Sequence, residues 1–196
     1  MVYKLEGRLI FFATNNVHKF EEARKVLAGY GIAVGMLRVK SFEIQSDSLE
    51  DIAKTSVTCA FKECKLPLIV EDAGLFVEAL RGFPGPYAAY VYKTIGNSGL
   101  LRLMNGVKNR KARFESAIAY LSTKSKPPIC FQGEVAGEIT REERKGKDKT
   151  SFGFDPIFKP TSSNKTFAEM TIDEKNTFSH RARALHKFAK WYESLE

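Results

Sequence analysis

A polar turn near the start of the chain combines residue types that could bind an anion. Thr14, Asn15, Asn16, His18 and Lys19 follow an apolar run and precede a helical pattern. A strand, a turn and a helix leave free N–H groups at the helix N-terminus, where the helix dipole favours a phosphate. Asparagine tolerates positive φ and its amide donates hydrogen bonds, and Lys19 adds a charge. A simple N-cap by Asn15 or Asn16 beside a surface lysine explains the same spacing.

Two adjacent acids form a second candidate group. Glu71 and Asp72 follow the apolar run 66–70, which predicts a buried strand with both carboxylates at its C-terminal end. Buried carboxylates are costly unless they are paired, hydrogen-bonded or metal-bound. Two acids near a phosphate site are a usual way to hold Mg²⁺. Glu43, from another loop, is a possible third acid, although by spacing alone an exposed loop acid explains it as well.

An aromatic segment further along could bind a base. Gly153 lies between Phe152 and Phe154, and Asp155 follows them. An aromatic face can stack on a base and an aspartate can accept a hydrogen bond from its N–H edge. The alternative is an aromatic turn in the protein core.

Three cationic or titratable residues complete the candidates. His180 and Arg181 lie at a predicted helix start, where a cation opposes the helix dipole. Arg181 is therefore better explained as a ligand contact than as a structural choice. Lys175 either serves a phosphate or lies exposed.

The elements that must position these residues follow from the apolar pattern. We expect strands at 8–14, 66–70, 110–122 and 129–140, and a further strand that leads into a loop over 32–44. Helices are predicted from Asn16 to Tyr30 with Gly31 as C-cap, from Ser48 to Lys65, and from Ser179 onward, with short helical segments through 100–107. Glycines and prolines over 82–86 predict a rigid turn, and residues 141–150 a charged loop.

This order predicts an α/β protein with a mixed central sheet, flanking helices and a ligand cleft at the strand ends. The 196 residues suffice for one domain with a hydrophobic core, which we take to span 1–196.

The composition limits the class of protein. The net charge of +8 suits a polyanionic partner, either nucleic acid or a phosphorylated ligand, and equally a solvated surface. No apolar run approaches the roughly 20 residues that span a bilayer, and the N-terminal run is too short for a signal peptide. We therefore expect a cytoplasmic protein with no membrane partner. Cys59, Cys64 and Cys130 form no CxxC pair and are expected to be buried apolar residues.

Seven segments in order resemble one family. They are TNNVHK, VEDAGL, GFPGPY, FGFDPIF, AEM, DEKN and SHRARAL, and together they are similar to the inosine triphosphate pyrophosphatase family from about Ile10 to Trp191. The resemblance implies a two-lobed α/β fold around a long mixed sheet, a homodimer, and Mg²⁺ as cofactor. It implies cleavage of the α–β phosphoanhydride of non-standard purine nucleoside triphosphates (ITP, dITP and XTP), giving the monophosphate and pyrophosphate.

The resemblance also implies roles for single residues. Thr14, Asn15, Asn16, Val17, His18 and Lys19 match the triphosphate loop, and Glu43 and Asp72 match metal positions, with Glu71 beside them. Asp72 also matches the proton acceptor. Ala73 matches a substrate contact, Phe152, Gly153, Phe154 and Asp155 match the base pocket, and Lys175, His180 and Arg181 match the remaining ligand contacts.

Three positions depart from the family pattern. Ala73 can offer only its backbone, where bacterial relatives often have serine. Many relatives carry a basic residue just after the GFPGPY turn, whereas Ala88, Ala89 and Tyr90 stand here. Ser56 falls where some relatives place a helix lysine.

Base choice would follow from hydrogen bonding. Hypoxanthine and xanthine present a C6 oxygen and an N1–H, so Arg181 or His180 facing the oxygen and Asp155 facing the N–H would suit them. Two alternatives remain: a pyrophosphatase for other modified nucleotides, and a basic nucleic-acid-binding module. The latter is less favoured because the chain lacks an RNP-type aromatic run and places acids beside the candidate phosphate site.

Overall fold

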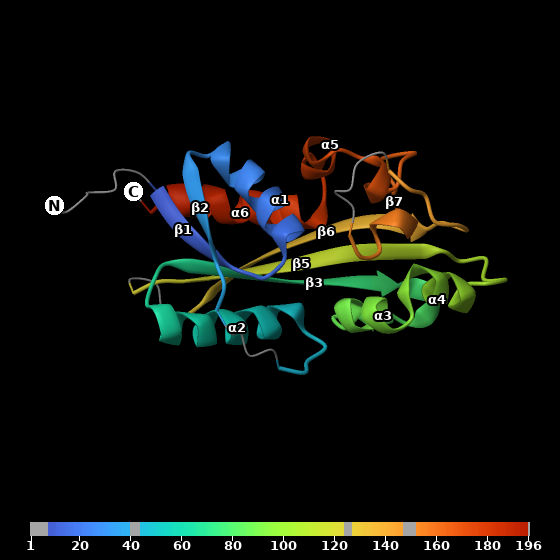
Figure 1. The fold of residues 1–196 in the computed structure, drawn as a ribbon, viewed down its shortest axis with the longest axis horizontal. Helices are drawn as coiled ribbons and strands as arrows, with labels where there is room; N and C mark the ends of the chain where they lie inside the picture. The colour runs from blue at the N-terminus through green and yellow to red at the C-terminus, as the bar shows by residue number, and fades with distance from the viewer. Residues whose placement is uncertain (1–7, 40–43, 124–126, 147–151, 196) are drawn as a thin grey trace.

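The computed structural model describes residues 8–39, 44–123, 127–146 and 152–195 (Figure 1). Glu43 and residues 147–150 of the expected charged loop lie outside them. The strands are β1 (Arg8–Ala13), β2 (Ile32–Leu37), β3 (Leu68–Val77), β4 (Pro84–Gly85), β5 (Lys111–Leu121), β6 (Ile129–Ile139) and β7 (Phe158–Pro160). The α-helices are α1 (Val17–Ala28), α2 (Leu49–Cys64), α3 (Ala88–Thr94), α4 (Gly96–Leu103), α5 (Ile172–Asn176) and α6 (His180–Glu193).

The strands form one mixed sheet, as the sequence predicts. Its order is β2-β1-β3-β5-β6-β7, with β4 paired to β3. β1 lies parallel to both β2 and β3, while β3, β5, β6 and β7 pair antiparallel. β3 therefore joins a parallel part of the sheet to an antiparallel part.

The prediction for β3 was wrong in its length. Glu71 and Asp72 lie inside the strand rather than at its end, because β5 pairs with β3 along its whole length from Leu68 to Val77. The pairing with β1 stops at Ile69. The two acids consequently lie just beyond the carboxyl end of β1, beside the turn that leads into α1.

A turn lies over residues 82–86, as expected. The Phe83–Pro84 peptide is cis, and Gly82 and Gly85 have positive φ. The backbone of Gly85 approaches β3 closely, since a Cβ on Gly74 would lie 2.6 Å from the Gly85 carbonyl oxygen. This contact fixes the start of α3, a helix that the sequence analysis did not predict.

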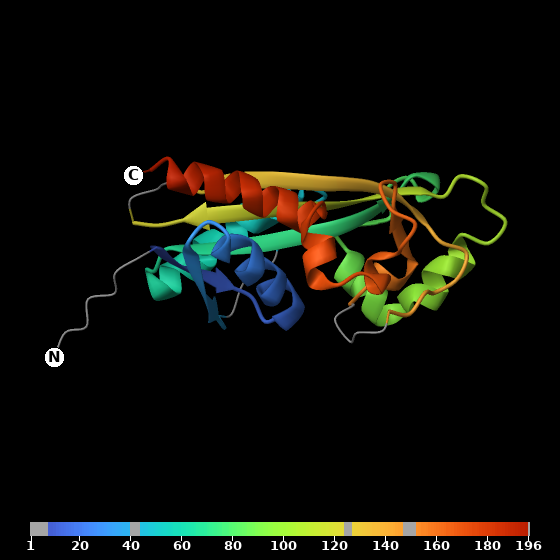
Figure 2. The same cartoon turned by 90° about the horizontal axis from the view of Figure 1, so that it is seen from above.

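Helices cover both faces of the sheet. α1 and α6 pack together over one face and α2 covers the other, while α3 and α4 lie near the far end of β3 (Figures 1 and 2). α1 ends at Ala28, earlier than predicted, and Gly31 instead adopts a φ of 66° where the chain turns into β2. α2 and α6 begin after their predicted caps, Ser48 and Ser179.

The hydrophobic core has three parts. One cluster packs α1 and α6 on the sheet and includes Phe12 and Phe188. A second lies under α2 and includes Val57. The third surrounds the far end of β3 and includes Phe114 and Phe158. None of the described helices combines the length and apolar character needed to cross a membrane.

Candidate active site

A cavity of about 290 Å³ opens where the segments singled out in the sequence meet. Its walls come from the turn before α1, from α3, from the segment 152–155, and from α5 and the start of α6. The predicted site residues that line it are Asn16, Lys19, Ala73, Phe152, Gly153, Phe154, Asp155, Lys175, His180 and Arg181. Segments separated by more than a hundred residues in the sequence therefore meet around one space.

The other predicted residues lie outside the cavity wall. Thr14 accepts a hydrogen bond from the Asn16 backbone N–H at 3.1 Å, and the His18 ring stacks on Phe152 with centroids 5.3 Å apart. Asn15 and Val17 are exposed.

The turn before α1 caps the helix and also directs a charge inward. The Asn16 side chain accepts from the Lys19 backbone N–H at 3.1 Å, so the N-cap alternative is correct for Asn16. Lys19 is not a surface lysine, because its Nζ lies 3.1 Å from Glu71 Oε2. The amino end of α1 and a lysine charge thus face the same cavity.

Glu71 is a buried carboxylate held by three partners. Its Oε1 accepts from Arg181 Nε at 2.9 Å and from Ser116 Oγ at 2.8 Å, and its Oε2 pairs with Lys19. Burial acts to raise the pKa of Glu71, but the charges of Arg181 and Lys19 outweigh it and hold the pKa well below its usual range. Both oxygens are therefore engaged by cations, which compete with the metal role predicted for this residue.

Asp72 lies in a different environment from Glu71. Successive residues of a strand project to opposite faces, so the two carboxylates point away from each other. Within the described ranges, no group of three or more histidine, cysteine, aspartate or glutamate side chains is arranged to hold a metal ion. Glu43, the remaining predicted ligand, is outside those ranges.

Sequence reasoning missed Glu22, a buried acid on α1 that is only 2% exposed. It pairs with Arg181 Nη1 and, at 2.9 Å, with Lys175 Nζ. Burial acts to raise its pKa, but the charges of Arg181 and Lys175 lower it to about 2. A signal was available, because Glu22 lies three residues after Lys19 and so on the same face of the helix.

Lys175 and Asp155 form the next pair. Lys175 Nζ lies 2.7 Å from Asp155 Oδ2, which also accepts from the Phe152 backbone N–H at 3.2 Å. Burial raises the pKa of Asp155, and Lys175 opposes this only in part. Burial acts to lower the pKa of Lys175, yet Asp155 and Glu22 raise it above its usual value, so the lysine is charged at neutral pH.

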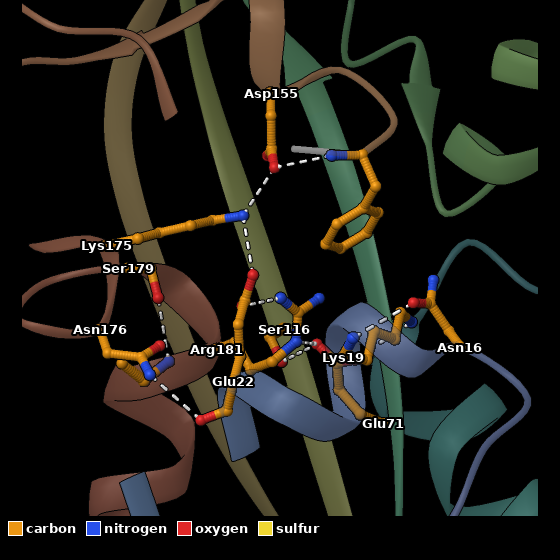
Figure 3. A network of polar contacts seen from close by, with 12 residues as sticks. Asn16, Lys19, Glu22, Glu71, Ser116, Asp155, Lys175, Asn176, Ser179 and Arg181 are labelled. Carbon is orange, nitrogen blue, oxygen red and sulfur yellow. Dashed lines mark hydrogen bonds and ion pairs between the residues drawn. The ribbon is translucent and has the colours of Figure 1, made fainter. Parts of the chain in front are cut away.

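These pairs join into one continuous chain of alternating charge (Figure 3). We call it the ion-pair chain, and it consists of Lys19, Glu71, Arg181, Glu22, Lys175 and Asp155 in that order. It connects the turn before α1 to the segment 152–155. Three cations and three carboxylates balance, which allows five buried charges and the partly buried Lys19 to lie together.

His180 contributes a neutral ring to the cavity. It stacks on Phe114 with centroids 4.8 Å apart and an interplanar angle of 12°. Burial, and then the charge of Arg181, hold the pKa of His180 well below 6.5. The imidazole is therefore uncharged at neutral pH, with one ring nitrogen able to donate and the other to accept.

Comparison with known proteins gives consistent results. The model of the Ham1 family matches residues 10–191. A dITP/XTP pyrophosphatase of Methanopyrus kandleri is 48% identical over 94% of this chain and 96% of its own length. One of Thermococcus kodakarensis is 49% identical over 92% of this chain and 95% of its own length.

Solved structures of the family share the fold. The Ham1 protein of Staphylococcus aureus aligns with a TM-score of 0.80 and 26% identity, covering 96% of this chain and 100% of that protein. A HAM1 protein from Coxiella burnetii gives a TM-score of 0.81 with 28% identity, covering 95% and 99%.

Proposed function

Because this chain belongs to the Ham1 family, we propose that the cavity at the carboxyl end of β1 is the active site of its pyrophosphatase activity. The protein hydrolyses non-standard purine nucleoside triphosphates, dITP and XTP among them, and so removes them from the nucleotide pool. The observation that best supports this site is a single cavity that contains both a helix N-terminus with a lysine and an aromatic segment with an aspartate. The products are the nucleoside monophosphate and pyrophosphate.

The triphosphate binds at the amino end of α1. Backbone N–H groups at this end carry a partial positive charge, and Lys19 adds a full charge beside them. Glu71 holds Lys19 in place at 3.1 Å, so the ammonium group is oriented before substrate arrives. Fixed charges of this kind stabilise the negative charge of a transferring phosphoryl group without reorganisation.

The base binds against the segment 152–155. The Phe152 ring, on which His18 stacks, lies next to Lys175, whose Nζ is 4.9 Å from the ring centroid. Phe152 also lines the cavity, and we assign the part of it that faces the cavity to contact with the base. Asp155 accepts two hydrogen bonds through Oδ2, and we assign its Oδ1 to the N1–H of the keto purine.

The C6 oxygen of the base accepts from Arg181 or His180. Nε and Nη1 of Arg181 are bound to carboxylates, and we assign Nη2, which makes neither bond, to the base. Adenine presents an amino donor and a bare N1 acceptor in these places, so a donor would face a donor and an acceptor would face the carboxylate of Asp155. A buried mismatch of this kind can reduce activity by several orders of magnitude.

Hydrolysis depends on a metal ion, for which we propose Mg²⁺. Magnesium in nucleotide sites takes one or two carboxylates together with substrate phosphates and water. Asp72 and Glu43 are the expected ligands, whereas both oxygens of Glu71 are held by other side chains. When bound, the ion neutralises charge on the phosphates.

Asp72 is also our candidate for the proton acceptor. This assignment rests on the match of Asp72 to the family pattern, because its side chain projects from the face of β3 opposite to that of Ala73, which lines the cavity. A carboxylate that reaches the phosphates can accept the proton of the attacking water, while Lys19 and the amino end of α1 oppose the charge on the phosphates. We further propose a single two-lobed domain, a homodimer and a cytoplasmic location.

Pyrophosphate release from dITP, XTP, ATP, GTP, CTP and UTP, with Mg²⁺ and with a chelator, tests this function. We expect the highest kcat/KM for dITP and XTP and no turnover without metal. A preference for the pyrimidine nucleotides would instead identify a pyrophosphatase for other altered nucleotides. Absence of hydrolysis with all six would contradict the proposal.

A further inference from the structure

A fourth cation lines the cavity in addition to the three of the ion-pair chain. Lys93, in the last turn of α3, is a wall residue of the same space. Its side chain is exposed, and it forms no ion pair with any residue that the structure describes. It was not among the residues singled out in the sequence.

The charges around the cavity show why Lys93 differs from the other cations. Lys19, Lys175 and Arg181 are each bound to carboxylates of the ion-pair chain, whose six charges cancel. Lys93 therefore supplies a positive charge that no described carboxylate offsets. A triphosphate carries several negative charges. Among the cations of the cavity wall, it is attracted most strongly to the one whose charge is not already neutralised by a carboxylate.

The position of Lys93 is fixed by its helix. α3 begins directly after β4, which pairs with β3 through Gly85 and Leu75. On α3 itself, Tyr92 packs edge-on against Phe154 with ring centroids 5.6 Å apart. The start of α3 is thus held near β3, and its later part is held against the segment 152–155.

The face that α3 presents to the cavity leaves room for a ligand. Ala88 and Ala89 line the same wall and have short, uncharged side chains. Lys93 lies one helical turn beyond Ala89 and so on the same face. It is the cationic residue of this wall, and its flexible stem can follow a phosphate group.

We propose that Lys93 is a substrate-binding residue that contacts the triphosphate from the α3 wall. The proposal rests on the function proposed above, since it assigns a further contact to the same site. It is a binding role and not a chemical one, so it predicts weaker binding for every nucleoside triphosphate with little change in kcat.

The test compares Lys93→Ala and Lys93→Arg with a matched control, Lys62→Ala. Lys62 is also exposed and lies in the last turn of its helix, α2, so both lysines interact alike with a helix C-terminus. Calorimetry measures the binding of inorganic tripolyphosphate with Mg²⁺, and steady-state kinetics measure KM for dITP, XTP and ATP. Thermal unfolding checks that all variants are folded.

We expect Lys93→Ala to weaken tripolyphosphate binding and to raise KM about tenfold for all three nucleotides, the lower end of the range for a hydrogen bond to a charged group. Lys93→Arg should restore most of the affinity, and Lys62→Ala should match the wild type. The slope of log affinity against log salt should also fall for Lys93→Ala, since one ionic contact is lost.

The proposal would be overturned if Lys93→Ala bound tripolyphosphate as tightly as Lys62→Ala does. It would also be overturned if Lys93→Ala raised KM for the nucleotide of one base alone. The two levels of inference fail separately. A wild-type protein that binds tripolyphosphate through Lys93 but hydrolyses no purine triphosphate would contradict the proposed function alone. A wild-type protein that hydrolyses dITP while Lys93→Ala binds normally would contradict only the role of Lys93.

Discussion

Replacing Glu22 by glutamine tests the ion-pair chain at its centre. Glu22 bridges Arg181 and Lys175, which are only 2% and 4% exposed. Glutamine keeps the shape of the side chain and removes its charge. Arg181 would then retain only Glu71, and Lys175 only Asp155, leaving the three cations of the chain against two carboxylates.

The expected loss of stability follows from the pKa of Glu22. The folded protein lowers that pKa from 4.5 to about 2, a difference of about 2.5 units. At about 1.36 kcal/mol per unit, this corresponds to roughly 3 kcal/mol at neutral pH. The value agrees with the roughly 3–5 kcal/mol that loss of one partner costs a buried ion pair. For a chain of this size it predicts a fall in Tm of roughly 6–12 °C.

The same shift gives a pH window. Because the folded-state pKa is lowered, the contribution of Glu22 is fully present above about pH 4.5 and is lost as the pH falls toward 2. The difference in unfolding free energy between wild type and Glu22→Gln should therefore shrink below pH 4.5.

Urea unfolding at pH 7 and at steps down to pH 3 measures this effect. The neighbouring acid provides a matched control, since Glu21 forms a more exposed pair with Arg24 at 2.7 Å. Glu21→Gln should cost less than about 1 kcal/mol. If Glu22→Gln costs no more than Glu21→Gln, or if its effect is the same at pH 7 and pH 3, the buried cations do not depend on Glu22.

Three further substitutions separate the parts of the site. Asp72→Asn should abolish turnover while the protein stays folded, as judged by its melting curve, and near-normal Mg²⁺-dependent hydrolysis would remove Asp72 from the mechanism. Lys19→Ala should weaken triphosphate binding alike for every base, and a loss limited to one base would mean that the turn before α1 does not bind phosphate. Arg181→Lys should reduce kcat/KM for dITP and XTP by roughly ten- to a hundredfold more than for ATP, because a charge-assisted hydrogen bond of roughly 1.5–3 kcal/mol is lost. Equal losses for dITP and ATP would show that Arg181 acts on phosphates or on folding.

Features with a local cause were predictable from the sequence. Asn16, Ser48 and Ser179 cap their helices as expected, because each cap depends on residues within one helical turn. The turn before α1, the segment 152–155 and the start of α6 were also identified from their own residue types, whereas α3, which lines the same cavity, was not. The sequence pattern placed the turn before α1 and the start of α6 at strand and helix ends, where binding sites often form.

Features that depend on distant partners were not predictable. The length of β3 is set by β5, and a strand that continues past two acids is stable only because that partner is there. Arg181 was assigned to a ligand because a cation opposes the helix dipole. The structure gives a second reason for an arginine at this position, because Arg181 forms ion pairs with the buried carboxylates of Glu22 and Glu71. Neither ion pair can be read from the order of residues in the sequence.

The ion-pair chain also constrains the order in which the protein can mature on the ribosome. Arg181 follows Glu22 by 159 residues, and at about 5–20 residues per second its synthesis comes roughly 8–30 s later. During that interval, packing α1 onto the sheet would bury Glu22 without its arginine, at a cost of several kcal/mol. We expect α1 to dock firmly only when α6 has left the ribosome, so that a nascent chain has no working nucleotide site before α6 emerges.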